Sequence, residues 1–297
     1  ALADSGCVSN YKEYAKWVNG VGFAIIDQIQ LKFGSTILDK HTGLWYDVWN
    51  ELTDPNRKEW PLVGKFTDET FKSIENLSDN TRYYIPLKFY FNRNPGLAVP
   101  IFLLNENELK VNISLKSLNS LLVFKKNDDN TTTINQRSIL DFKFYATYVF
   151  LEAEEESRIQ NSLPSEYLVE TLDIKDNINA SGAKNLVFEN PTKEFIWVFR
   201  HNSRLVVGDT NTNIPIITAP LDNTNSNDIF NYACKGKNTQ LQYGSRDPFS
   251  KLIIKINNNE RFEQTDSTFF RTMQPYKHHS NIPGGIDRAF KKKFIYC

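Results

Sequence analysis

The chain has 297 residues, which is enough for two ordinary domains or one large one. Hydrophobic residues make up 40% of the chain and aromatic residues 13%, while 35 Lys and Arg balance 35 Asp and Glu. This composition excludes a disordered chain, which would be poor in apolar residues and highly charged, and it lacks the basic excess of a dedicated nucleic-acid-binding domain.

The first predicted element is a hairpin. In Ile25–Phe33 apolar and polar residues alternate with the period of two that is typical of a strand. Asp27 is the one polar residue on the apolar side, and we expect it to be hydrogen-bonded near a sheet edge. Gly34-Ser35 is a tight-turn signal, after which Thr36–Lys40 is predicted to return as the second strand.

A change of period in Gly43–Leu52 predicts an amphipathic helix. Its apolar stripe consists of Leu44, Val48 and Leu52, with Trp45 and Trp49 beside it. Pro55 is expected to end the helix, because the residue before proline avoids the helical region. His41 falls in the turn between the hairpin and the helix, where we expect a surface or turn role in preference to a ligand role. Residues 54–80 are polar and irregular, typical of a long loop.

The segment Tyr84–Lys116 predicts a strand, a crossover and a second strand. Apolar residues occupy every second position in Tyr84–Phe91 and again in Leu109–Lys116, so that Ile113 faces a core and Asn112 faces away. Arg93-Asn94-Pro95-Gly96 is expected to stop the first strand, because proline cannot donate to a ladder.

A boundary is predicted near the middle of the chain. After the polar loop Lys125–Gln136 comes a strongly apolar strand, Ile139–Leu151, whose later part is apolar on both faces, as expected of a strand buried between layers. The charged segment Glu152–Asn161 favours a short linker helix, and Pro164 follows it. We therefore expect a first domain at residues 1–151, a linker at 152–164 and a second domain at 165–297.

The second half repeats the outline of the first. Its predicted strands are Tyr167–Ile174, Asn185–Phe188, Glu194–His201 and, after an Asn-rich excursion at Gly208–Asn231, Leu252–Ile256. The turn Asn257–Asn259, the strand residues Arg261–Glu263 and the aromatic segment Ser267–Gln274 then reproduce the earlier order of strand, hairpin, strand and helix. Such internal similarity indicates duplication of one unit and favours two tandem β-sandwiches.

The pattern from Ile85 to Pro100, IPL-x-aromatic-x-aromatic-x-R-N-P-G-L-A-x-P, resembles the major capsid proteins of nucleocytoplasmic large DNA viruses, in their algal-virus and mimivirus-like forms. Further stretches similar to that family are Trp17-Val18-Asn19, Gly43–Thr53, the junction Phe142–Ser157 with Glu166–Glu170, Phe188–Val198, Gln274-Pro275 and His278–Ile286. Asn190 stands where the family commonly has histidine. The resemblance implies an all-β fold: two tandem antiparallel jelly-roll β-sandwiches (a double jelly roll) with short helical insertions. It also implies truncation at both ends, since the family has sheet-forming sequence before the equivalent of Ala1 and after that of Cys297.

The function implied by the resemblance is structural. Such a subunit would assemble as pseudo-hexameric homotrimers that tile an icosahedral capsid. The implied partners are further copies of the chain, minor capsid proteins and an inner viral membrane, without sequence-specific nucleic acid. The protein would belong to the virion and assemble in the host cytoplasm. The basic runs Lys125-Lys126 and Lys291–Lys293 are interpreted as solvated charges, the second giving at most a weak membrane contact.

The residues predict no enzyme, no cofactor and no metal site. No nucleophile, phosphate-binding or zinc-protease motif is present, and the glutamates of Glu152–Glu156 fan around a helix and do not converge. His278-His279 are expected on an extended strand, where adjacent side chains point to opposite faces and chelate poorly. Cys7, Cys234 and Cys297 are far apart in sequence and are interpreted as free thiols.

Two interpretations that involve carbohydrate remain open. Sequons at Asn76, Asn130 and Asn179 are candidate glycosylation sites, whereas the sequon at Asn112 lies within a predicted strand. A carbohydrate-binding β-sandwich is the alternative function. In that case Trp45, Trp49, Trp60 and Trp197 would stack on sugars. The spacing of Trp45 and Trp49 on a helix is, however, typical of packing.

Overall fold

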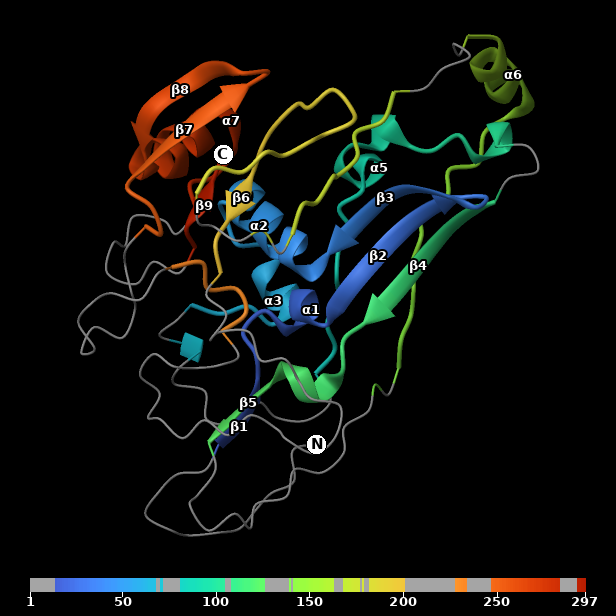
Figure 1. Ribbon diagram of the computed structural model, residues 1–297. Coiled ribbons are helices and arrows are strands. Elements are labelled where there is room, and N and C mark those ends of the chain that lie inside the picture. The colour runs from blue at the N-terminus through green and yellow to red at the C-terminus, as the bar shows by residue number, and fades with distance from the viewer. Residues whose placement is uncertain are drawn as a thin grey trace.

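The computed structural model describes residues 14–67, 70–71, 81–104, 108–125, 139, 141–162, 168–176, 178, 182–200, 228–233, 247–283 and 293–297. The predicted loop at 126–136, most of the Asn-rich excursion, Cys7 and Cys234 lie outside these ranges. The described residues form small antiparallel sheets linked by short helices and extended segments (Figure 1).

A three-stranded antiparallel sheet holds the first hairpin. It contains β2 (Ile26–Phe33), flanked by β3 (Thr36–Thr42) and β4 (Leu109–Leu115). Gly34 takes the left-handed conformation in the turn, with φ of 58°, and the predicted hairpin is confirmed. In β4 the residues from Leu109 to Leu115 alternate between half-buried and exposed, so the predicted faces of this strand are also confirmed.

The prediction for Asp27 is wrong. The pairing of β2 with β4 shifts register between Ile26 and Gln28, which turns the Asp27 side chain to the surface. Ile26 is buried in its place, with 2% exposure. A bulge of this kind inserts one residue and reverses the alternation locally, which the period of two does not reveal.

Helix α2 (Gly43–Thr53) lies between the three-stranded sheet and the strands labelled β6, β7, β8 and β9 (Figure 1). It begins after Thr42, whose Oγ1 accepts a hydrogen bond from the Trp45 backbone N–H (3.4 Å), and it ends before Pro55, as predicted. Its buried face differs from the predicted stripe. Val48 and Leu52 are buried, but so are Tyr46, Asp47, Asn50 and Glu51, whereas Trp45 and Trp49 remain partly exposed.

Two short helices pack near α2. They are α1 (Val21–Ala24) and α3 (Trp60–Val63). The approach of α1 to α2 is close, since a Cβ added at Gly43 would lie 2.1 Å from the Phe23 carbonyl oxygen. Glycine is therefore required at the first position of α2.

The predicted strand Tyr84–Phe91 is not formed. The segment is extended, without ladder pairing to any other described residue, and ends in a helical turn, α5 (Tyr90–Arg93), followed by the 3-10 turn η1 (Pro95–Leu97). Buried and exposed residues do not alternate along this segment, because Lys88, Phe89 and Tyr90 are all buried. Lys88 is buried in spite of its charge because its ammonium group forms an ion pair with Glu59. Further single turns are η2 (Ile101–Leu103) and η3 (Leu118–Leu121), and β1 (Tyr14–Trp17) pairs with β5 (Leu122–Lys125).

Near the predicted boundary the expected helix is present, but the expected buried strand before it is not found among the described residues. The helix predicted at Glu152–Asn161 is present as α6 (Ala153–Ser162), whereas its role as a linker stays a prediction. Residues 141–151 belong to the predicted strand Ile139–Leu151, whose later part is predicted to be buried on both faces. They are extended but unpaired within the described chain, and Phe150 is 94% exposed. Residues 168–174 and 185–188 are likewise extended without ladder pairing there, and only Trp197–Val198 of the predicted strand at 194–201 forms a strand, β6.

The second half contains the predicted repeat. β7 (Lys251–Ile256) and β8 (Asn259–Asp266) form a hairpin, followed by a π-helical turn (Phe269–Met273) and α7 (Gln274–His278). Asn257 and Asn258 form its turn with φ of 51° and 64°, as two-residue hairpin turns require. The order therefore matches that of β2, β3 and α2. β9 (Ile295–Tyr296) pairs with β6.

One hydrophobic cluster joins the two halves. Its fully buried members from the first half include Phe23, Tyr46, Leu52 and Phe89, and those from the second half include Tyr232, Phe270, Phe294 and Tyr296. The two halves are thus packed together in the neighbourhood of α2.

Candidate functional site: the junction of the two halves at helix α2

Helix α2 presents three polar side chains to the interior. Asp47, Asn50 and Glu51 lie three and four residues apart, which places them on one face of the helix. Lys65, which follows α3, reaches all three: its Nζ lies 2.8 Å from Asp47 Oδ1, 2.8 Å from Glu51 Oε1 and 3.2 Å from Asn50 Oδ1. The first half of the chain therefore builds a buried polar group with one cation.

The second half supplies the remaining partners. Lys293 Nζ lies 2.6 Å from Asp47 Oδ2, and the Tyr232 hydroxyl donates a hydrogen bond to the same oxygen (2.7 Å). Asn281 closes the end of α2, because its Nδ2 donates to the Glu51 carbonyl (2.8 Å) and its backbone N–H donates to the Leu52 carbonyl (3.0 Å). Together these contacts attach the second half to α2.

The charges in this group balance, with two carboxylates and two ammonium groups. Burial by itself would raise the pKa of Asp47, but Lys293 and Lys65 outweigh it and lower this pKa to about 2. Burial would lower the pKa of Lys65, yet Asp47 and Glu51 raise it, whereas burial prevails at Lys293 and lowers its pKa. Burial, with Asp47 beside it, raises the pKa of the Tyr232 hydroxyl well above its usual range.

The arrangement suits a structural role. Both Asp47 oxygens accept hydrogen bonds from protein donors, and the Asp47 side chain has no exposed surface. A general base or nucleophile needs an approach path for its substrate, which Asp47 does not have. The group therefore holds the two halves together. We call it the clamp, and its members are Asp47, Asn50, Glu51, Lys65, Tyr232 and Lys293.

Lys293 overturns the interpretation of Lys291–Lys293 as solvated charges. Its side chain is 17% exposed and is paired with Asp47, whereas Lys291 and Lys292 lie outside the described residues. One feature of the sequence could have indicated this burial. Lys293 directly precedes Phe294, Ile295 and Tyr296, each of which is at most 1% exposed.

A second contact between the halves involves Asp39 and His41. Both are buried and both point inward from β3. Asp39 Oδ1 accepts a hydrogen bond from the Leu172 backbone N–H (3.0 Å), and Asp39 Oδ2 lies 3.0 Å from His41 Nε2. His41 also stacks on Phe89, with ring centroids 4.5 Å apart. The expectation of a surface or turn role for His41 is therefore wrong, because β3 continues through Thr42 and carries His41 into the core.

A third contact involves Arg93, the arginine of the R-N-P-G segment. Arg93 Nη1 lies 2.9 Å from Glu170 Oε2, and its guanidinium carbon lies 4.6 Å from the centre of the Trp49 ring. Lys193 also pairs with Glu170. The hydrogen bond from Lys193, followed by the charges of Lys193 and Arg93, outweighs burial and lowers the pKa of Glu170. Arg93 thus connects the crossover of the first half to the second half.

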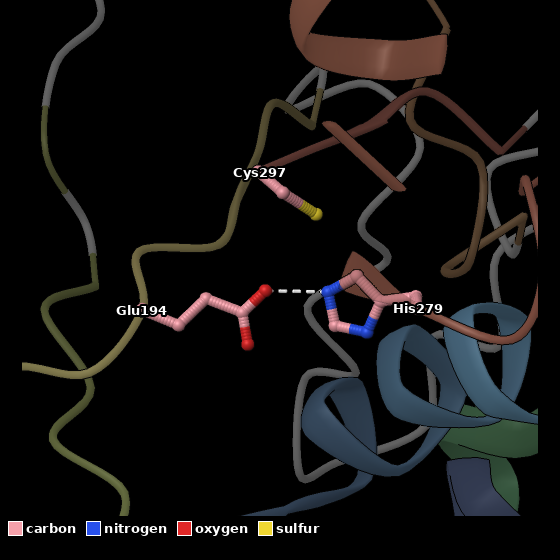
Figure 2. A group of neighbouring side chains, drawn as sticks. All are labelled: Glu194, His279 and Cys297. Atoms are coloured by element: carbon pink, nitrogen blue, oxygen red, sulfur yellow. Dashed lines mark hydrogen bonds and ion pairs between the residues drawn. The ribbon is translucent and has the colours of Figure 1, made fainter. Parts of the chain in front are cut away.

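His278 and His279 do not lie on an extended strand, contrary to the prediction. His278 is the last residue of α7. His279 Nε2 pairs with Glu194 Oε1, and Cys297 lies beside both residues (Figure 2). Sequence reasoning considered only His278 as a companion for His279, since Glu194 and Cys297 are remote in the chain.

The four tryptophans considered for sugar stacking all pack against protein side chains. Trp45 and Trp49 have ring centroids 5.1 Å apart, and Trp60 lies against the Arg57 guanidinium at 4.5 Å. Trp197 contacts Phe270 with a centroid distance of 5.4 Å. The candidate glycosylation residues Asn76, Asn130 and Asn179 lie outside the described residues, so that expectation stays a prediction.

Comparison with known proteins decides the family. Residues 1–152 match the family model "Major capsid protein N-terminus", and residues 156–288 match "Large eukaryotic DNA virus major capsid protein". The chain belongs to the major capsid protein family of large eukaryotic DNA viruses. The suspected resemblance is thereby confirmed.

Individual relatives agree with this assignment. The major capsid protein of Phaeocystis pouchetii virus is 23% identical over 361 residues, covering 91% of this chain and 69% of the relative. That of Chrysochromulina ericina virus is 28% identical over 225 residues, covering 63% of this chain and 38% of the relative. Against these two relatives the chain therefore spans between 38% and 69% of their lengths.

A solved structure shows the shared fold. The PBCV-1 virus capsid matches with a TM-score of 0.61 and 20% sequence identity, over 96% of this chain and 68% of that chain. The antiparallel sheets described above agree with an architecture of this kind.

Proposed function

We propose that this major capsid protein folds as two tandem jelly-roll sandwiches, at residues 1–151 and 165–297, joined by the linker at 152–164. The observation that supports this division is that two family models match the chain in succession and meet at α6. The repeat of hairpin and helix on either side of α6 supports it independently.

The proposed subunit assembles as a homotrimer. Two similar rolls in each subunit give a cyclic trimer a nearly six-fold outline, which can tile the facets of an icosahedral capsid. Contacts between trimers would complete the shell of the virion, and assembly would take place in the host cytoplasm.

An exposed apolar surface supports self-association. Its large side chains, all at least half exposed, are Phe142, Phe144, Tyr145, Tyr148, Val149 and Phe150. They lie on one extended segment that is unpaired within the described chain. A monomer in water seldom exposes so much contiguous apolar surface, and an unpaired strand offers its backbone to a partner. We assign this surface to burial in the assembled subunits.

Light scattering and electron microscopy of the full-length subunit test this proposal. We expect trimers and larger sheet-like assemblies, and we expect Tyr148→Asp together with Phe150→Asp to shift the mass toward the monomer. Lys255→Asp, on the exposed face of β7, is the control and should leave the mass unchanged. A subunit that stays monomeric at high concentration would overturn the trimer.

The same proposal includes no enzymatic activity and no sequence-specific nucleic-acid binding. The closed surroundings of Asp47 and the balanced charge of the chain support it. Minor capsid proteins and an inner viral membrane are the further proposed partners. Among the described residues no helix is both long and apolar enough to cross a membrane. Assays for hydrolysis and for DNA retention at physiological salt should both be negative.

A further inference from the structure

Three side chains that can bind metals meet in the second half of the chain. Glu194 precedes β6, His279 follows α7 and Cys297 follows β9. A carboxylate oxygen, a ring nitrogen and the sulfur of these residues all lie within 4.8 Å of one another. In Figure 2 the Glu194 carboxylate points at the His279 ring, and the Cys297 sulfur points into the space beside them.

Well-defined backbone contacts position each of the three residues. The pairing of Trp197 with Tyr296 fixes the ends of β6 and β9, and thus the segments that carry Glu194 and Cys297. The Cys297 backbone N–H also donates to the Phe270 carbonyl (3.2 Å). These contacts place two donors at the same edge of the smallest sheet.

His279 is held on the other side. Its backbone N–H donates to the Pro275 carbonyl (2.9 Å). Its ring packs edge-on against Trp49, with ring centroids 6.0 Å apart and an angle of 88° between the ring planes. The His279 side chain is 4% exposed and that of Glu194 is 33% exposed. The cluster therefore has a buried inner side and an outer side that water can reach.

We propose that Glu194, His279 and Cys297 bind a zinc ion, with water as the fourth ligand. Zinc prefers four tetrahedral ligands drawn from sulfur, nitrogen and carboxylate oxygen. Zinc–ligand distances near 2.0–2.3 Å place the donor atoms of such a site about 3.3–3.8 Å apart. Donors that already lie within 4.8 Å of one another reach this spacing through small side-chain movements.

The charges of the cluster suit a divalent cation. Glu194 contributes one carboxylate, and Cys297 contributes a thiolate once zinc is bound. Zinc binding forms the sulfur–zinc bond and releases the thiol proton to water. The carboxylate and the thiolate then neutralise the two positive charges of the ion, while the imidazole stays neutral.

The zinc ion would link three segments of the second half. Within the described residues β6 and β9 share two residue pairs, Trp197 with Tyr296 and Val198 with Ile295. A metal bound by Glu194 before β6, by Cys297 after β9 and by His279 after α7 would add a cross-link to these pairs. This role is independent of trimer formation, so its test is separate from that of the proposed assembly.

Metal titration of the purified chain tests the site. We expect calorimetry to detect one zinc ion per chain, and cobalt(II) in its place to give the charge-transfer absorption of a thiolate ligand. Cys297→Ser should abolish that absorption, and Glu194→Gln should weaken binding by about tenfold or more. Glu194 is exposed enough for its variant to keep the fold, which circular dichroism would verify.

Two controls separate this site from other ligands in the chain. His278→Gln changes an exposed neighbour of His279 and should leave binding unchanged. Replacing Cys7 and Cys234 together by serine removes the other thiols and should preserve the cobalt spectrum. Absence of stoichiometric zinc binding, or a thiolate absorption that survives Cys297→Ser, would overturn the site.

Discussion

Lys293 Nζ lies 2.6 Å from Asp47 Oδ2, although 246 residues separate them in the chain. The second half of the protein thus neutralises a carboxylate that the first half buries. A buried ion pair of this kind contributes little net stability compared with a well-packed apolar pair, but breaking it leaves an uncompensated charge. The pair therefore mainly fixes the position of the second half on α2, since the polar groups of α2 have all their partners only when the second half is in place.

Asp47→Asn tests this dependence. The amide has the shape of the carboxylate but not its charge, so Lys65 and Lys293 are left with one anion fewer. We expect the free energy of unfolding to fall by about 3–5 kcal/mol, as for other broken buried pairs. Urea denaturation monitored by tryptophan fluorescence would measure the change.

Asp27→Asn is the matched control, because Asp27 is exposed at a bulge. Its effect should stay within about 0.5 kcal/mol, as for ordinary surface substitutions. Adding Lys293→Met to Asp47→Asn should recover part of the loss, because the unpaired ammonium group is removed. Equal effects of the two aspartate variants would show that Asp47 is not part of a clamp.

Asp47 also predicts a loss of stability in acid. Its pKa is about 2 in the folded protein, against 3.8 for an ordinary aspartate. A lowered folded-state pKa contributes stability that is complete above about pH 4 and is lost as the pH falls toward 2. Because one pKa unit is worth about 1.4 kcal/mol, this contribution is about 2 kcal/mol.

Denaturation midpoints measured between pH 5 and pH 2.5 would detect this loss. The pH dependence should be shallower when Asp47→Asn is combined with Lys293→Met, since the Asp47 carboxyl no longer titrates and no unpaired ammonium group is left in its place. Parallel curves for this double variant and the unchanged chain would assign the acid sensitivity to other carboxylates.

The sequence predicted the elements that depend on neighbouring residues. Gly34 and the asparagines at 257 and 258 mark their turns by backbone preference, and the spacing of Val48 and Leu52 marks α2. The charged composition of α6 marks the linker helix in the same way. Local chemistry was sufficient for each of these.

The clamp and the cluster around His279 could not be predicted in this way. From the sequence Lys293 is predicted to be a surface residue, because nothing shows that Asp47 lies opposite it. His41 is predicted to be a turn residue, because nothing shows that it stacks on Phe89. Residues 141–151 have the pattern of a buried strand, yet nothing in the described chain covers them. A pattern of apolar residues shows that a face will be buried without showing which partner buries it.

Substitutions on β4 test the confirmed face assignment. Ile113 packs against the core and pairs with Ile29, which is 2% exposed, whereas Asn112 is exposed. We expect Ile113→Lys to cost about 2 kcal/mol or more, because it places an unpaired charge against the core. Asn112→Lys should cost less than about 0.5 kcal/mol in the same denaturation assay. Equal losses would mean that the two faces of β4 are exchanged.

Gly43→Ala tests the close approach of α1 to α2. Helix propensity and steric packing predict opposite effects of this substitution on stability. On helix propensity alone, alanine within α2 would stabilise the protein by about 1 kcal/mol. In the structure, however, the new Cβ would lie 2.1 Å from the Phe23 carbonyl oxygen and 2.8 Å from that of Ile26. Both neighbours are backbone atoms that cannot rotate away, so we expect a loss of about 3 kcal/mol.

Gly96→Ala is the control for this substitution. Its new Cβ would meet only the Asn94 side chain, with the nearest atom, Oδ1, at 3.3 Å, and Gly96 is exposed. A shift of a few tenths of an ångström in Asn94 removes that contact, so the effect should be below about 1 kcal/mol. Thermal unfolding of both variants decides between the arguments. If Gly43→Ala raises the midpoint temperature, the close packing of α1 on α2 is wrong, and the glycine would be explained by turn formation alone.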